Sequence, residues 1–226
     1  MNKLLIIGTG QHARMLVELI EEQAKFQIVG FVSKEKEEKK IYNYPIVCND
    51  NNVKNFLKKN PSIKYYVCGV GDNFGGMIGR RKIIEKFDKK LIAATIISPK
   101  AYISKFSKIE KGCVIEAFAK IMNGVKLGRH SMVESFTAVN HDQKIGENVF
   151  IGNNCALAGK LVGSDTIIGD GSVIGYKVNI GKNCIINQGT KIYKNIKSHS
   201  IVYGSPLVIV KNNALFTKIL KNKKNV

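Results

Sequence analysis

Residues 145–157 read IGENVFIGNNCAL, so Ile145, Ile151 and Leu157 stand six residues apart. The same spacing extends in both directions along the chain. Its leading residues, all Ile, Leu or Val, are at positions 97, 103, 109, 115, 121, 127, 133, 139, 145, 151 and 157 and then, after a shift of one residue, at 162, 168, 174, 180, 186 and 192. A regular six-residue period of this kind predicts a parallel β-helix built of stacked coils.

The other places in each six support this prediction. The fifth place is usually small or β-branched, and the fourth is often Gly, Asn or Asp, which tolerate the left-handed backbone of a tight corner. We expect the first and fifth places to point inward. Three of the five cysteines, Cys113, Cys155 and Cys184, take the fifth place, so we interpret them as inert core residues. No CxxC pair is present, and we predict neither a disulfide framework nor a metal site.

The chain begins with a different pattern. Residues 4–20, LLIIGTGQHARMLVELI, read as a strand, a glycine turn and an amphipathic helix. The turn is a GxGxxA variant of the dinucleotide-binding motif, which by itself is a weak signal. A true NAD site needs an acidic residue about 20 residues later to bind the ribose. The second predicted strand ends in Ser33-Lys34 instead, which argues against hydride transfer.

Two domains and a tail account for the chain of 226 residues. Residues 1–95 are predicted to form a Rossmann-like α/β domain, with 33–45 as a charged loop. Residues 96–226 are predicted to contain the all-β, left-handed parallel β-helix, followed by a short C-terminal helix within 211–226 whose apolar face carries Leu215, Phe216, Ile219 and Leu220.

The net charge of +19 favours anionic partners. The lysines do not gather in one stripe and lack interleaved aromatic residues, so we do not expect nucleic acid as a partner. No apolar run is long enough to span a bilayer, and the first residues do not resemble a signal peptide. We therefore expect a cytoplasmic protein without stable membrane insertion.

The hexapeptide period and the N-terminal turn together resemble a known family. The chain is similar, over roughly residues 1–210, to the hexapeptide-repeat sugar acetyltransferases of sialic acid, perosamine and bacillosamine pathways. This resemblance implies a homotrimer, acetyl-CoA as cosubstrate and a sugar or nucleotide sugar as acceptor. Phe106, Phe118 and Phe136, each at a fourth place, are expected to point outward, where neighbouring subunits would cover them.

The family carries a histidine–acid pair as its catalytic base, and His141-Asp142 matches it. The chemistry agrees, because acetylation of an amine or hydroxyl requires a proton acceptor and a neutral imidazole suits that role near neutral pH. A neighbouring carboxylate orients the ring and stabilises its protonated form. His141 holds a third place, between inward positions, so we expect it to project outward.

The resemblance also implies binding residues. For the coenzyme the matching positions are Gly159, Asp170 and Gln188, and for the sugar or nucleotide sugar they are Gly10, Gln11, His12, Gly71 and Glu134.

Three positions depart from the family pattern. Phe150 replaces a second histidine expected near acetyl-CoA, Glu134 replaces an asparagine, and Gln143 replaces a small residue after the histidine–acid pair. Glu134 has two interpretations, either as a charge that supports an amine substrate or as an ordinary exposed coil residue.

We interpret the chain as an acetyl-CoA-dependent acetyltransferase that acts on the amine of a nucleotide-linked amino-deoxy sugar. An O-acetyltransferase of sialic acid or a related nonulosonate, and a non-catalytic sugar-binding trimer, remain as alternatives at this point.

Overall fold

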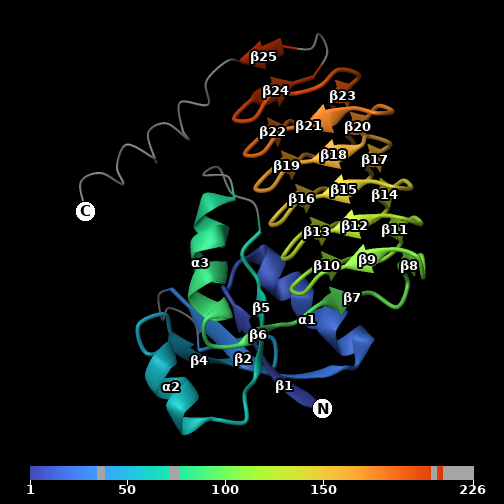
Figure 1. Ribbon diagram of the computed structural model, residues 1–226. Coiled ribbons are helices and arrows are strands. Elements are labelled where there is room, and N and C mark those ends of the chain that lie inside the picture. The colour runs from blue at the N-terminus through green and yellow to red at the C-terminus, as the bar shows by residue number, and fades with distance from the viewer. Residues whose placement is uncertain (35–38, 72–76, 205–207, 211–226) are drawn as a thin grey trace.

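The computed structural model describes residues 1–34, 39–71 and 77–204 and the backbone of 208–210. It shows a mixed α/β unit beside a column of stacked coils (Figure 1). The predicted fold class, an α/β domain followed by a parallel β-helix, is confirmed.

The α/β unit is a six-stranded sheet of order β3-β4-β2-β1-β5-β6. All neighbours are parallel except the short pair β3–β4. Its strands are β1 (Asn2–Ile7), β2 (Phe26–Ser33), β3 (Lys40–Ile41), β4 (Tyr44–Asn49), β5 (Tyr65–Cys68) and β6 (Ile92–Ala93), and its helices are α1 (Gln11–Gln23), α2 (Val53–Lys59) and α3 (Ile78–Asp88).

Strand alternation divides this unit into two cores. Leu4 and Ile6 pack with α1 on one face, whereas Leu5 and Ile7 pack with residues of α2 and α3 on the other. The near-continuous apolar sequence of β1 follows from this burial on both faces.

The predicted six-residue period is confirmed in every coil, because each leading residue is the second residue of a two-residue strand. Sheet I contains β7 (Ile96–Ile97), β10 (Val114–Ile115), β13 (Met132–Val133), β16 (Phe150–Ile151), β19 (Ile167–Ile168), β22 (Ile185–Ile186), β24 (Ile201–Tyr203) and β25 (Val208–Val210). Sheet II contains β8 (Tyr102–Ile103), β11 (Lys120–Ile121), β14 (Ala138–Val139), β17 (Ala156–Leu157), β20 (Val173–Ile174) and β23 (Lys191–Ile192). Sheet III contains β9 (Lys108–Ile109), β12 (Lys126–Leu127), β15 (Lys144–Ile145), β18 (Leu161–Val162) and β21 (Asn179–Ile180).

The corners between these sheets use a left-handed backbone at the fourth place, as predicted. Asn148 and Asn154 adopt positive φ, as expected for their residue type. Phe118 and Phe136 adopt the same conformation, with φ of 61° and 60°, although bulky residues rarely do so. Stacking of the coils therefore imposes the corner geometry even where the residue does not favour it.

The shift in the period removes one residue from a single corner. Residues 158–160 join sheets II and III with three residues, whereas residues 140–143 join them one coil earlier with four. The shortened corner has no residue with positive φ, whereas Asp142 supplies one at the fourth place one coil earlier. Gln143, the buried fifth-place residue of the preceding coil, donates hydrogen bonds from Nε2 to the carbonyl oxygens of Asn140 and Leu157. Its longer side chain thus extends toward the shortened coil, which explains why a small residue does not occupy this position.

The outer face of sheet I carries the α/β unit. Ile96, Val114, Met132, Phe150 and Ile167 share one core with α1 and the sheet of the α/β unit. The strand positions just before the leading residues are apolar on sheet I, because they are buried against a second element. On sheet II the equivalent positions include Lys120 and Lys191, which are exposed.

Three further expectations concern the charged loop, the C-terminal helix and membrane-spanning segments. The charged loop predicted over 33–45 is partly wrong, because Lys40 and Ile41 pair antiparallel with Pro45 and Tyr44. The predicted C-terminal helix within 211–226 lies outside the described residues. Among the described residues, none of the helices combines the length and apolar character needed to cross a membrane.

The close stacking of coils generates the first testable prediction. A Cβ on Gly128 would lie 2.5 Å from backbone atoms of Gly146 in the next coil, so Gly128→Ala should lower the free energy of unfolding by roughly 1–3 kcal/mol. Gly79 in α3 has nothing within 4 Å of the equivalent position, so Gly79→Ala serves as the matched control and should leave stability unchanged or raised. Denaturant midpoints measure both effects, and equal midpoints for the two variants would contradict the stacking argument.

Candidate functional site

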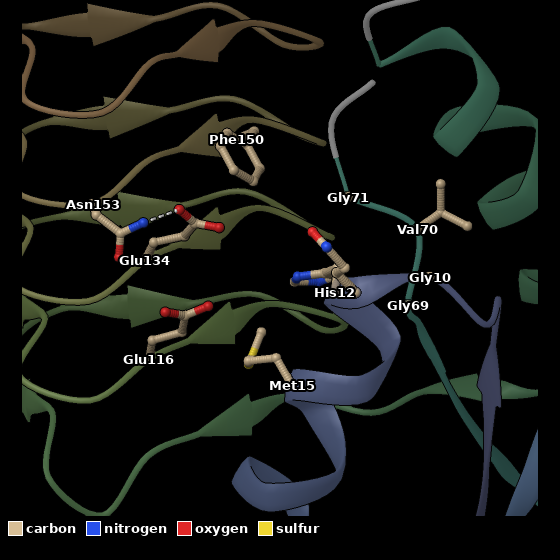
Figure 2. Close-up of a pocket in the computed structure, with 11 residues that line it drawn as sticks. Gly10, His12, Met15, Gly69, Val70, Gly71, Glu116, Glu134, Phe150 and Asn153 are labelled. Atoms are coloured by element: carbon tan, nitrogen blue, oxygen red, sulfur yellow. Dashed lines mark hydrogen bonds between the residues drawn. The ribbon is translucent and has the colours of Figure 1, made fainter. Parts of the chain in front are cut away.

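One hollow lies where the α/β unit meets the β-helix, and we name it the interdomain pocket (Figure 2). Its volume is about 680 Å³. It is lined by Gly10, Gln11, His12, Met15, Gly69, Val70, Gly71, Glu116, Glu134, Phe150 and Asn153. The five residues predicted to bind the sugar, Gly10, Gln11, His12, Gly71 and Glu134, all line this pocket.

Three titratable side chains meet inside the interdomain pocket. His12 projects from the first turn of α1 toward Glu116 and Glu134 on the β-helix (Figure 2). One ligand atom from each of the three lies within 4.8 Å of the others. Glu134 accepts a hydrogen bond of 2.6 Å from Asn153, and Glu116 accepts bonds from the backbone and hydroxyl of Ser135.

Burial determines the charge states of this cluster. Burial, assisted by the Arg80 cation, lowers the pKa of His12 to about 3, so its imidazole is neutral near pH 7. Burial also raises the pKa of Glu116, against the hydrogen bonds from Ser135. The Nε2 atom of His12 is buried and has no hydrogen-bond partner among the described residues.

A buried arginine holds the pocket walls together. Arg80, which is 1% exposed, donates from Nε to the carbonyl of Val70 and from Nη1 to the carbonyl of His130 and the side chain of Asn148. It thereby joins the Gly69–Gly71 segment to two successive coils. His130 is buried, and its Nε2 atom lies 3.0 Å from a carboxylate oxygen of Asp88 in α3.

A second hollow, which we name the corner pocket, opens at the shortened corner between sheets II and III. Its volume is about 490 Å³. It is lined by Asn140, His141, Asp142, Ala158, Gly159, Lys160, Tyr176, Lys177 and Asn179.

His141 and Asp142 lie on the rim of the corner pocket. The Nδ1 atom of His141 is 3.0 Å from an Asp142 carboxylate oxygen, and both side chains are exposed. Asp142 is the fourth-place residue of its corner and has a φ of 60°. The positive φ turns the chain at this point, and the contact with Asp142 engages Nδ1 of the ring and not Nε2.

The residues predicted to bind the coenzyme are not brought together within one chain. Gly159 lines the corner pocket, one coil after His141. Asp170 and Gln188 lie instead at corners between sheets I and II, in the same column of corners as Glu116, Glu134 and Asn153. Phe150, predicted to replace a histidine near acetyl-CoA, packs on sheet I and lines the interdomain pocket, not the corner pocket.

Sequence reasoning missed Glu116, Asn153 and Met15 as pocket residues. Glu116 carries a signal that could have revealed it. Both glutamates directly follow a leading residue, and they are separated by one full coil of 18 residues, which stacks Glu134 on Glu116.

Comparison with known proteins is consistent with this architecture. Residues 3–87 match the family described as the PglD N-terminal domain. A perosamine N-acetyltransferase from Caulobacter crescentus, crystallised with CoA and GDP-perosamine, superposes with a TM-score of 0.85 at 21% identity and covers 93% of this chain and 97% of its own. The acetyltransferase domain of PglB from Neisseria gonorrhoeae gives 0.83 at 22% identity, covering 93% and 100%.

The chain has the fold of these sugar N-acetyltransferases. WeeI from Acinetobacter baumannii shares it as well, with a TM-score of 0.80 at 18% identity over 92% of this chain and 100% of its own. Among curated proteins, an acyl-carrier-protein–UDP-N-acetylglucosamine O-acyltransferase from Pseudomonas entomophila is 32% identical over 81 residues, which is 35% of this chain. The chain spans about a third of the length of that relative, 31%.

The lowered pKa of His12 generates a prediction. Because burial favours the neutral imidazole, the His12 ring signals in NMR should stay unchanged from pH 8 down to pH 5, where an ordinary histidine titrates with a midpoint near 6.5. Comparison with spectra of His12→Gln assigns the resonance. A titration step of His12 between pH 5 and 8 would show that the neighbouring carboxylates outweigh burial.

Proposed function

We propose that this protein is an acetyl-CoA-dependent N-acetyltransferase that acts on the amine of a nucleotide-linked amino-deoxy sugar in the cytoplasm. The observation that carries the proposal is the exposed His141–Asp142 pair at the rim of the corner pocket, on a fold shared with sugar N-acetyltransferases. In this proposal the amine nitrogen attacks the thioester carbonyl as His141 accepts its proton. The carbon–sulfur bond then breaks, and the imidazolium returns the proton to the CoA thiolate.

The corner pocket fits the acetyl donor in shape and charge. Removal of one residue from the corner at 158–160 places Gly159 directly beyond His141, with no side chain between them. Lys160 and Lys177 line the same pocket and supply positive charge suited to coenzyme phosphates. Asp170 and Gln188 belong to the opposite wall of the coenzyme groove, which in this proposal a neighbouring subunit provides.

The positions of the two pockets favour an active site between subunits. The interdomain pocket opens at the corners between sheets I and II, whereas His141 lies at a corner between sheets II and III of the same coil. In a homotrimer the sheet I–II corners of one subunit face the sheet II–III corners of the next. The sugar-binding residues Gly10, Gln11, His12, Gly71 and Glu134 then come from one chain, and His141 comes from its neighbour.

A carboxylate-lined acceptor pocket favours an amine over the hydroxyl of sialic acid. Glu116 and Glu134 stabilise a cationic group, and sialic acid would add a third carboxylate to theirs. The interdomain pocket thus supports N-acetylation over the O-acetyltransferase alternative.

Removal of the base tests the reaction. His141→Ala should lower kcat by roughly 10²–10⁴-fold, because the amine proton then has no acceptor, while the Kd for CoA stays close to that of the wild type. Asp142→Asn should cost less, since the imidazole remains. The assay measures CoA release from acetyl-CoA with GDP- and UDP-linked amino sugars and with sialic acid. A near wild-type kcat for His141→Ala would show that another group is the base, and transfer to sialic acid alone would favour O-acetylation.

The proposed assembly is tested separately. Phe106, Phe118 and Phe136 are 70%, 56% and 61% exposed, and the rings of Phe118 and Phe136 stack with centroids 5.1 Å apart. Such an apolar edge is typical of a surface covered by a partner. Sedimentation velocity at micromolar concentration should give a trimer, and Phe118→Asp combined with Phe136→Asp should shift it toward monomer with loss of transfer. A monomeric wild type with full activity would rule out an intersubunit site.

A further inference from the structure

The interdomain pocket has the opposite charge to the protein that contains it. The chain carries a net charge of +19, yet no lysine or arginine is among the described residues that line this pocket. Its charged lining residues are Glu116 and Glu134, stacked in successive coils. In so basic a chain, this pocket is suited to a cationic group and not to phosphate.

The third member of the cluster strengthens this preference. His12 is held on α1, and Arg80 behind it forms part of the buried contact between the two domains. Because the ring is neutral, one of its two nitrogens can accept a hydrogen bond. The cluster therefore offers two carboxylates and one ring nitrogen, and one acceptor atom of each lies within 4.8 Å of the others.

The spacing of the cluster accommodates an ammonium group. Three acceptors around an ammonium at about 2.9 Å lie about 4.7 Å from one another. Around a zinc ion at about 2.1 Å they lie about 3.4 Å apart. The three ligand atoms lie within 4.8 Å of one another, a limit that accommodates the ammonium spacing and also the zinc spacing.

We propose that His12, Glu116 and Glu134 form a cradle that binds the acceptor sugar as its ammonium ion and removes the first of the two protons lost during acetylation. This inference rests on the proposed function and assigns Glu116, together with its neighbours, a role in that reaction. His141 can accept only one proton, yet an amino sugar that enters as R–NH3+ must lose two to become an amide.

The proton balance of the two steps is complete. In the first step one N–H bond of R–NH3+ breaks and the proton passes to a glutamate carboxylate, leaving R–NH2 with its lone pair. In the second step R–NH2 attacks the acetyl thioester, His141 of the neighbouring subunit takes the second proton, and that proton leaves with the CoA thiol. The glutamic acid returns its proton to solvent when the product departs.

The surroundings of Glu116 and Glu134 suit carboxylates that bind the ammonium group and then accept one of its protons. Burial and the nearby Asp170 raise the pKa of Glu116, while the Ser135 hydrogen bonds oppose this shift. Asn153 donates to Glu134 and fixes its carboxylate. Arg80 is the cation that acts on His12, and its guanidinium is engaged with Val70, His130 and Asn148.

The test compares Glu116→Gln, Glu134→Gln and the double variant with Glu147→Gln, an exposed glutamate of the β-helix that lines neither pocket. The acceptors are GDP-perosamine and a UDP-linked 4-amino sugar. GDP-6-deoxymannose, which has a hydroxyl in place of the amine, is the inhibitor control. Values of kcat/KM are measured across the pKa of each acceptor's ammonium group, which is determined independently by NMR.

The cradle predicts a specific pH signature. The wild type uses the ammonium form, whereas the double variant must select the rarer free amine. The ratio of variant to wild-type kcat/KM should therefore fall about tenfold per pH unit below the acceptor's pKa. Each single variant should raise the acceptor KM about 10–100-fold, with the GDP-6-deoxymannose inhibition constant and the CoA Kd unchanged. Glu147→Gln should match the wild type throughout.

The outcomes that would contradict the cradle differ from those that would contradict the proposed function. A pH-independent ratio in an active enzyme overturns the cradle and leaves the proposed function standing. Absence of acetyl transfer by the wild type to either amino sugar rejects the proposed function, and the cradle with it. Titration with zinc chloride tests the other occupant that such residues accept. Zinc binding that is lost in Glu116→Gln, with an unchanged acceptor KM, would show a metal site instead.

Discussion

Repetition of one coil on the next is the constraint on which this molecule depends. From Ile115 onward each leading Ile, Leu or Val is buried against its counterpart one coil away, and before the shortened corner residues 18 positions apart occupy equivalent places. The same register that fills the core also places Glu134 on Glu116 and Gly159 beyond His141. At 158–160, where the period loses one residue, the corner opens into a pocket beside the His141–Asp142 pair. The candidate catalytic pair therefore lies beside the one place where the repeat is interrupted.

The second requirement is that the α/β unit holds a fixed position on sheet I. Apolar residues on the outer face of sheet I supply the contact area, and the buried guanidinium of Arg80 fixes its orientation by binding both domains. Arg80 also donates a hydrogen bond to the carbonyl of Val70, which lines the interdomain pocket. The same side chain therefore fixes the α/β unit against the β-helix and positions a wall of the pocket. Removal of either domain would leave His12 without the two glutamates, so neither domain contains this cluster alone.

The electrostatic contrast between surface and pocket gives the proposed reaction a physical basis. A protein with excess lysine attracts anionic nucleotide sugars and coenzyme A to its surface. In our proposal, two carboxylates and a neutral imidazole inside the interdomain pocket reverse this preference and bind the amine. The phosphates and the amine of one substrate would then bind at different places, which would orient the acceptor before it meets the thioester.

The β-helix, its register and its single shortened corner could be read from the sequence alone, because each coil repeats the same local packing problem and therefore the same residue types. The GTG turn and helix α1 could also be predicted, since apolar residues recur with different periods in strands and in helices. The meeting of His12 with Glu116 could not be predicted, because it depends on how the α/β unit sits against sheet I, and no local pattern encodes that contact. The same holds for Phe150, whose position nine residues after His141 suggested proximity to the coenzyme, although the coil turns it toward the other pocket. Gln143 illustrates both contributions. The sequence identified it as an unusual residue for its place, but only the packed core explains its long amide side chain, which donates a hydrogen bond to Leu157 at the shortened coil.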